Sequence, residues 1–270
     1  MEPVRRVVRD PRFDRLVPAG AELLRLADGV IWAEGPVYLP AEDGVVWSDE
    51  RGNVVRRWSA ADGAIEGYRP SDFANGHTLD HDGRILACEH GPRRVSSYER
   101  DGSRTTIVAR YQGKRLNSPN DIVVASDGAI WFTDPPYGIL DDSEGYKADS
   151  ELGGRLVFRF DRTTGDLTVA TDAIVHPNGL AFSPDETTLY VSDTSAPRIE
   201  GGNHHILAFD VLEGRRLASP RVFSVIQPGL PEGRSATPRP TDTTRSAGSP
   251  RRPIPRASRQ PRRSTPTRTC

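Results

Sequence analysis

Apolar residues in this chain occur in short runs between polar turns, and no ten-residue stretch keeps a helical spacing of apolar positions. A unit recurs in which an Asp-Gly or Pro-Asp turn leads into a short apolar run that ends in an acidic residue. The unit occurs at 43–49, 82–89, 127–134 and 184–193. Further β-rich runs follow at 54–58, 94–98, 155–160 and 205–209. Because Asp-Gly between two such runs is a strong hairpin signal, the pattern predicts an all-β protein built from a repeated sheet.

The spacing of the repeat favours one all-β architecture. The Asp residues of the four turns are 39, 45 and 58 residues apart, and the blades of a β-propeller repeat about every 40–50 residues. The longer gaps coincide with insertions at 135–154 and 194–203. A β-sandwich is the alternative, but it does not account for the repeated sequence. We therefore expect a β-propeller, whose repeated sheets leave only short, protected edges.

A polar residue stands before most repeats, at the start of the strand expected to be innermost. These residues are Glu34, Asn75, Asn120, Asn178 and, at the end of the recognisable pattern, Glu232. Inner strands of a propeller line a central channel, so equivalent positions converge there. Carboxylate and amide oxygens that converge suit a hard cation, and Ca²⁺ tolerates irregular oxygen geometry best. The alternative for each position alone is an ordinary turn residue.

Other polar residues have simpler interpretations. The acidic residue that ends each repeat favours turn capping over catalysis. The insertion segment 141–145 predicts an exposed acidic loop, with a lid over the channel as the alternative. His77, His90 and His176 lack the spacing of a zinc site. Cys88 lies in an apolar run, which favours a small buried side chain.

Charge divides the chain into two unlike parts. The formal net charge of −1 combines residues 1–233, with 26 Lys and Arg against 36 Asp and Glu, and a tail of ten Arg and one Asp. A net charge of −10 on the first part argues against a nucleic-acid partner. The N-terminus lacks the apolar core of a signal peptide, and no apolar run is long enough for a membrane span. We expect a cytoplasmic protein without a membrane partner.

The tail, residues 234–270, is rich in Arg, Pro, Thr and Ser and has no aromatic residue. Such a composition predicts disorder. A basic tail that binds RNA or an acidic surface is one interpretation. We prefer the interpretation that the tail is an out-of-frame translation of GC-rich DNA beginning near codon 233, which resequencing would test. We accordingly expect 1–17 to be a lead-in, 18–233 an incomplete propeller and 234–270 a disordered tail.

Four motifs carry a family resemblance. They begin at Trp32 (WAEGP), Leu116 (LNSPND), Trp131 (WFTD) and His176 (HPNGLAFSPD). Together they resemble the SMP-30/gluconolactonase/LRE-like family over about residues 18–233. The resemblance implies a six-bladed propeller, here truncated in the fifth blade, with a divalent cation in its channel and sugar lactones as substrates.

The resemblance also implies roles for individual residues. Glu34 and Asn178 correspond to metal ligands, and Asn120 to a metal or substrate contact. Glu232 stands where the family has the Asp that is both a ligand and the proposed general base. The longer side chain would move that carboxylate by about 1 Å. Ser118 stands where some members have a substrate-holding Arg, so it receives no such role, and Asn75 becomes a channel-wall residue.

The predicted chemistry is lactone hydrolysis. A cation held by carboxylates and amides can polarise the lactone carbonyl, while Glu232 accepts the proton of the attacking water. Ca²⁺ is the first choice of cation, with Zn²⁺ or Mn²⁺ as alternatives. The rival functions are phosphotriester hydrolysis at the same site and a non-catalytic or inactive propeller fragment.

Overall fold

The computed structural model describes residues 8, 10–22, 25–99, 101–227, 229 and 231. The chain divides into two compact units, 1–238 and 239–270, and all described residues belong to the first. Glu232 and the tail 234–270 lie outside the described residues. The expectations for them therefore stay predictions.

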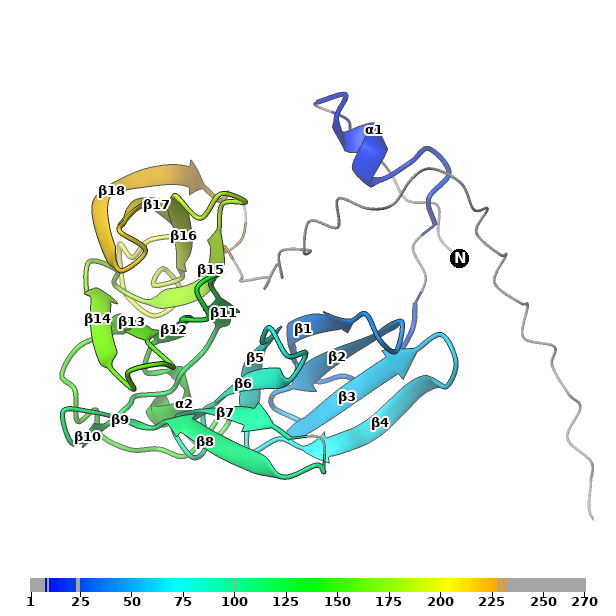
Figure 1. The fold of residues 1–270 in the computed structure, drawn as a ribbon, viewed down its shortest axis with the longest axis horizontal. Coiled ribbons are helices and arrows are strands. Elements are labelled where there is room, and N and C mark those ends of the chain that lie inside the picture. Colours follow the sequence, from blue (N-terminus) through cyan, green and yellow to red (C-terminus); the bar gives the residue numbers. More distant parts are fainter. Residues whose placement is uncertain are drawn as a thin grey trace, which may run out of the picture. The chain divides into compact units, whose positions relative to one another are not determined.

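Four antiparallel sheets of four strands follow one another along the chain (Figure 1). The first contains β1 (Ala33–Leu39), β2 (Gly44–Asp49), β3 (Val54–Ser59) and β4 (Gly63–Pro70). The second contains β5 (Ala74–Leu79), β6 (Ile85–Glu89), β7 (Arg94–Tyr98) and β8 (Arg104–Val108). The third contains β11 (Ile122–Val124), β12 (Ile130–Asp134), β13 (Leu156–Phe160) and β14 (Leu167–Thr171). The fourth contains β15 (Pro177–Phe182), β16 (Thr188–Asp193), β17 (His205–Leu212) and β18 (Arg216–Val225).

The remaining described elements are small. β9 (Arg110–Tyr111) and β10 (Lys114–Arg115) form a two-stranded sheet, and the helices α1 (Phe13–Leu16) and α2 (Tyr137–Leu140) have four residues each. None of the described helices has the length and apolar character needed to cross a membrane. The prediction of an all-β protein is confirmed.

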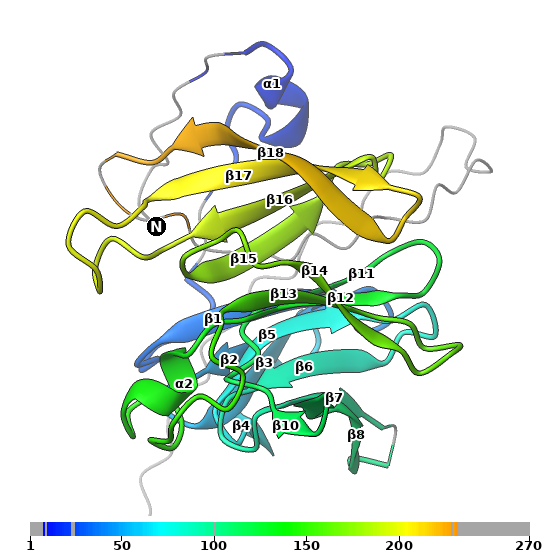
Figure 2. The ribbon, with the colours of Figure 1, turned by 90° about the vertical axis from the view of Figure 1, so that its left-hand side faces the viewer.

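Strand order explains the sequence repeat. Within each sheet the strands pair in chain order, and the four predicted apolar runs form the second strands, β2, β6, β12 and β16. The first strands contact one another from sheet to sheet, β1 with β5, β5 with β11 and β11 with β15. The fourth strands form the opposite edges of their sheets (Figures 1 and 2). Equivalent first-strand positions are thereby brought next to each other.

Apolar clusters between consecutive sheets hold this arrangement together. On β12, Trp131 and Phe132 are both fully buried but point to opposite faces. Phe132 packs with β6 residues such as Leu86 and Cys88, and Trp131 packs with Leu189 of β16. Burying one such aromatic side chain contributes about 1.5–3 kcal/mol. The prediction that Cys88 is a small buried residue is confirmed.

Candidate functional site

The first strands of consecutive sheets approach each other closely where the predicted polar residues lie. The Gly76 N–H donates to the carbonyl oxygen of Asn120 at 2.8 Å. A Cβ atom on Gly76 would lie 2.6 Å from that oxygen, and one on Gly35 would collide with the Asn75 backbone. Glycine after Glu34 and after Asn75 therefore lets these backbones meet.

Asp121 and Thr133 extend the contact to the fourth sheet. The Asp121 carboxylate accepts hydrogen bonds from the Ile122 N–H at 2.9 Å and the Leu180 N–H at 3.1 Å. Burial raises the pKa of Asp121 to about 6. The Thr133 hydroxyl donates to the carbonyl oxygen of Asn178 at 2.8 Å.

We call the four strand heads joined in this way the oxygen row. Its members are Glu34, Asn75, Asn120 and Asn178. Neighbours in the row come from consecutive sheets and are linked through the contacts above, which include the side chains of Asp121 and Thr133. The structure thus places three of the four predicted metal-site residues in one series, while Glu232 lies outside the described residues.

The side chains of the three predicted ligands differ in their surroundings. Glu34 is half-buried, and its Oε1 accepts a hydrogen bond from Trp32 Nε1 at 2.9 Å. Asn120 is 4% exposed. Asn178 is half-buried, and its amide nitrogen lies 3.4 Å from Thr194 Oγ1.

The donor set fits a hard cation. Among the described residues, no group of three or more His, Cys, Asp or Glu side chains gathers in a metal-binding arrangement. A site on the oxygen row would use carboxylate and amide oxygens only, which are the ligands that Ca²⁺ prefers. The row has none of the His or Cys ligands typical of zinc sites.

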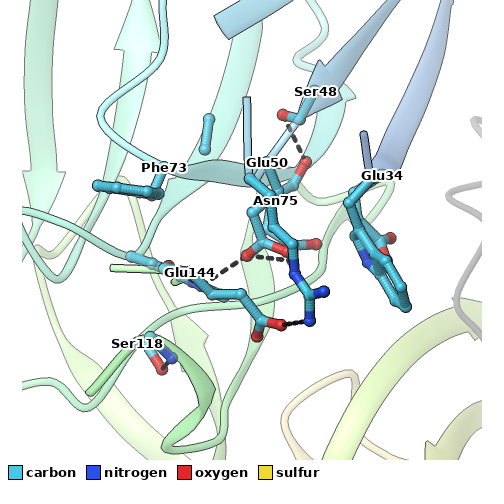
Figure 3. A network of polar contacts seen from close by, with 12 residues as sticks. Glu34, Ser48, Glu50, Phe73, Asn75, Ser118 and Glu144 are labelled. Carbon is cyan, nitrogen blue, oxygen red and sulfur yellow. Dashed lines mark hydrogen bonds and ion pairs between the residues drawn. The ribbon is translucent and has the colours of Figure 1, made fainter. Parts of the chain in front are cut away.

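A buried polar network lies behind Asn75 (Figure 3). Glu50 Oε1 accepts a hydrogen bond from Asn75 Nδ2 at 3.0 Å and lies 2.8 Å from His90 Nδ1. Burial alone would lower the pKa of His90, but the Glu50 carboxylate beside it raises that pKa above its usual value. For His77 burial dominates and lowers the pKa to about 4, although its Nδ1 lies 3.1 Å from the Gly35 carbonyl oxygen.

The insertion segment 141–145 matches its expectation as an exposed acidic loop only in part. Asp141 and Asp142 are exposed, but Glu144 is buried. The Glu144 carboxylate accepts a hydrogen bond from Arg51 at 2.6 Å, and its other oxygen lies 3.8 Å from Arg198. The Arg51 guanidinium in turn lies 4.4 Å from the centre of the Trp32 ring. The buried acid therefore ties the insertion to loops of the first and fourth sheets.

The acidic residues that end the repeats mostly act as caps, as predicted. Asp49, Asp134 and Asp193 accept backbone hydrogen bonds from the segments before the first strands of their own sheets. The donors are the N–H groups of Ile31 and Trp32, of Asn117, and of Val175 and His176. Glu89 differs, because it pairs with the side chains of Arg94 and Arg104.

Two buried polar residues, Ser118 and His176, stand two positions before Asn120 and Asn178 of the row. Ser118 Oγ donates to the Pro135 carbonyl at 2.6 Å and accepts from the Gly138 N–H at 3.0 Å, which anchors the start of the insertion. His176 is buried with its ring edge-on to Tyr137, and burial lowers its pKa to about 4. Neither ring nitrogen of His176 has a hydrogen-bond partner among the described residues.

Two surface hollows lie elsewhere. One of about 570 Å³ is lined by Tyr68, Tyr98 and Arg104, and one of about 590 Å³ by Arg84 and Asp101 among others. Neither is lined by a residue of the oxygen row.

Comparison with known proteins identifies the family. Residues 32–238 match the SMP-30/gluconolactonase/LRE-like region. The chain belongs to this family.

Named relatives include several lactonases. A gluconolactonase from Zymomonas mobilis is 34% identical over 207 residues, which cover 70% of this chain and 57% of that protein. A pentonolactonase from Haloferax volcanii is 29% identical over 205 residues, 74% of this chain and 61% of that protein. The structure of a gluconolactonase from Xanthomonas campestris matches with a TM-score of 0.71 and 43% identity, over 77% of this chain and 67% of that one. The chain thus spans less than two thirds of the Zymomonas and Haloferax relatives.

Proposed function

We propose that the protein is a divalent-metal-dependent hydrolase that opens sugar lactones. The oxygen row carries this proposal, because family membership and an oxygen-only donor set coincide at the same strand heads. The named gluconolactonase and pentonolactonase relatives support the substrate class.

The proposal includes the architecture. The four described sheets would be consecutive blades of a six-bladed β-propeller, with their first strands lining its channel. The supporting observation is that β1, β5, β11 and β15 contact one another in order while each sheet keeps its strands in chain order. The oxygen row would then face the channel.

Glu34, Asn178 and Glu232 would hold the cation, with Asn120 as a further ligand or a substrate contact. Ca²⁺ fits this donor set first, with Mn²⁺ or Zn²⁺ as alternatives. The bound cation would supply Lewis-acid polarisation of the lactone carbonyl.

The chain's own residues would orient the groups and move the proton. Trp32 donates to one oxygen of Glu34 and so fixes how that carboxylate is turned. Glu232 would accept the proton of the water that attacks the carbonyl carbon. Asn120, whose backbone is bonded to Gly76 on one side and to Thr133 on the other, would hold the substrate from a rigid wall.

A substrate panel tests the function. The full chain, supplied in turn with Ca²⁺, Mn²⁺ and Zn²⁺, is assayed on glucono- and pentonolactones and on a phosphotriester. We expect lactone opening above the spontaneous rate, and a loss of at least about 100-fold in kcat for Glu232→Gln, because an amide cannot serve as the base. Phosphotriester cleavage without lactone opening would favour the rival hydrolase. Tight metal binding without turnover of either substrate would favour a binding scaffold.

A further inference from the structure

The hydrogen bonds of Asn75 determine which end of its amide faces outward. A carboxylate accepts hydrogen bonds, so the amide nitrogen of Asn75 must face Glu50, which it contacts at 3.0 Å. The amide oxygen then points away from Glu50. No described residue donates a hydrogen bond to this oxygen. The oxygen keeps some exposure to solvent, because it is not one of the buried side-chain atoms that lack a partner.

The backbone of Asn75 is fixed from two sides. Ser48, fully buried on β2, donates its hydroxyl to the Asn75 carbonyl at 3.0 Å. The next residue, Gly76, is bonded to Asn120 at 2.8 Å. The side chain therefore starts from a rigid position between Glu34 and Asn120 in the oxygen row.

Glu50 and His90 make the orientation of the amide costly to change. Both are 1% exposed, and their side chains lie 2.8 Å apart. The attraction within a buried pair of this kind offsets the free-energy cost of desolvation only when the geometry is good and the remaining hydrogen bonds are satisfied. Turning the amide would place the Asn75 oxygen against the Glu50 carboxylate and leave one acceptor unpaired. The amide behaves as a preorganised acceptor, strengthened by the carboxylate behind it.

We propose that Asn75 contacts the substrate: its amide oxygen accepts a hydrogen bond from a ring hydroxyl of a polyhydroxylated lactone, and Glu50 is the residue that positions it. This inference rests on the proposed lactonase function. A hydroxyl suits the position because Asn75 is neutral and the Glu50 charge behind it is paired with His90. A site built to hydrogen-bond a hydroxyl discriminates strongly against an analogue that lacks it.

The test compares two substrates. Asn75→Ala and the wild-type full chain are assayed on glucono-1,5-lactone and on δ-valerolactone, which has the same ring without hydroxyls. We expect kcat/KM for the hydroxylated lactone to fall about tenfold or more, in line with the loss of one hydrogen bond and the unpaired hydroxyl that remains. The value for δ-valerolactone should change less than about threefold. An equal fall on both substrates would show a merely structural role and overturn the proposal.

A double variant tests the direction of the amide. Asn75→Asp alone places two carboxylates side by side, so we expect it to be impaired. In Glu50→Gln/Asn75→Asp the new amide at position 50 can donate to the new carboxylate at position 75 and leave an acceptor oxygen outward. We expect this double variant to recover the preference for the hydroxylated lactone that Asn75→Ala loses. Failure to recover it in a double variant that folds as well as Asn75→Ala by urea unfolding would count against the proposal.

Two further measurements distinguish a substrate contact from a metal ligand and from a failure of the proposed function. Calcium titration should give the same Kd for Asn75→Ala and the wild type, and a weaker Kd in the variant would make Asn75 a metal ligand instead.

Binding of 1,5-anhydroglucitol, a hydroxylated ring that cannot be hydrolysed, is followed by saturation-transfer NMR. The wild type should bind it and Asn75→Ala should bind it less. A wild type that binds this ring but opens no lactone would refute the proposed function alone, whereas no binding by the wild type would overturn the Asn75 proposal.

Asn203→Ala is the matched control. Asn203 also donates its amide to a carboxylate at 3.0 Å, that of Asp193, but it lies outside the oxygen row. We expect a comparable loss of stability and no change in the ratio between the two lactones.

Discussion

At the scale of single residues, one feature recurs: a buried carboxylate accepts hydrogen bonds from backbone N–H groups. Asp134 is fully buried, and its Oδ2 accepts the Asn117 N–H at 2.8 Å. Its other oxygen has no hydrogen-bond partner among the described residues. Burial is the largest influence and raises the pKa of Asp134 to about 7, although the hydrogen bonds and Arg93 act in the other direction. Burial therefore makes the charged form of the Asp134 carboxyl less favourable in the folded protein than in the unfolded chain.

Asp134 predicts a defined pH dependence of stability. In the unfolded chain the carboxyl has its ordinary pKa of 3.8, whereas burial in the fold raises that pKa to about 7. Its contribution is thus fully present below pH 3.8 and is lost as the pH rises towards 7. Asp134→Asn cannot ionise, so its free energy of unfolding should rise relative to wild type by about 2–4 kcal/mol between about pH 4 and pH 8. Urea unfolding at the two pH values measures this, and a pH-independent difference would contradict it.

The sequence locates the residues of the row but not their supports. Glu34, Asn75, Asn120 and Asn178 share a position before each repeat, and that register is visible in the chain. Their supports cannot be found by spacing, because they are contacts between residues far apart in sequence. Glu50 reaches Asn75 across 25 positions, and the neighbouring Arg51 reaches Glu144 across 93.

Glycine controls how closely strands meet at the scale of elements. The head of β5 can lie against the segment before β11 only because Gly76 has no side chain. The same reasoning explains the glycine after Glu34, because a Cβ atom on Gly35 would lie 2.2 Å from the Asn75 carbonyl oxygen. At these two positions glycine is a packing requirement.

Gly76→Ala tests this packing. Its Cβ would lie 2.6 Å from the Asn120 oxygen and 2.7 Å from Asp121 Oδ1, so the Asn120 segment must move. We expect a loss of about 1–3 kcal/mol in the free energy of unfolding together with a fall in lactone turnover. Gly154→Ala is the control, since its Cβ would make only an ordinary contact at 3.5 Å with Leu156. Equal stability and turnover for Gly76→Ala and wild type would refute the close approach.

Strands and insertions differ in how well a sequence predicts them. The apolar runs predict β2, β6, β12 and β16 because the pattern of burial along a strand is a local property of the chain. The acidic composition of segment 141–145 predicts exposure, and Glu144 departs from it. Its burial depends on Arg51 and Arg198, which lie in loops of other sheets. Local composition carries no information about such partners.

Family membership supports the proposed lactone-opening function at the scale of the whole molecule. The family region covers residues 32–238, which include all four described sheets. The all-β class and the repeat can be derived from the chain because each sheet is a contiguous segment. The number of blades in the proposed propeller stays a prediction, because the described residues form four sheets of four strands and one of two.

The decisive experiment is the rate of glucono-1,5-lactone opening by the full chain with Ca²⁺, after chelation, and with Glu34→Gln in the presence of Ca²⁺. The variant keeps the size of the side chain but removes the charge that would hold the cation. We predict opening above the spontaneous rate for the wild type with Ca²⁺ but not after chelation, and a rate at least about 100-fold lower for the variant. Equal rates for Glu34→Gln and the wild type, or no rate above the spontaneous one with any divalent cation, would contradict a lactone-opening site on the oxygen row.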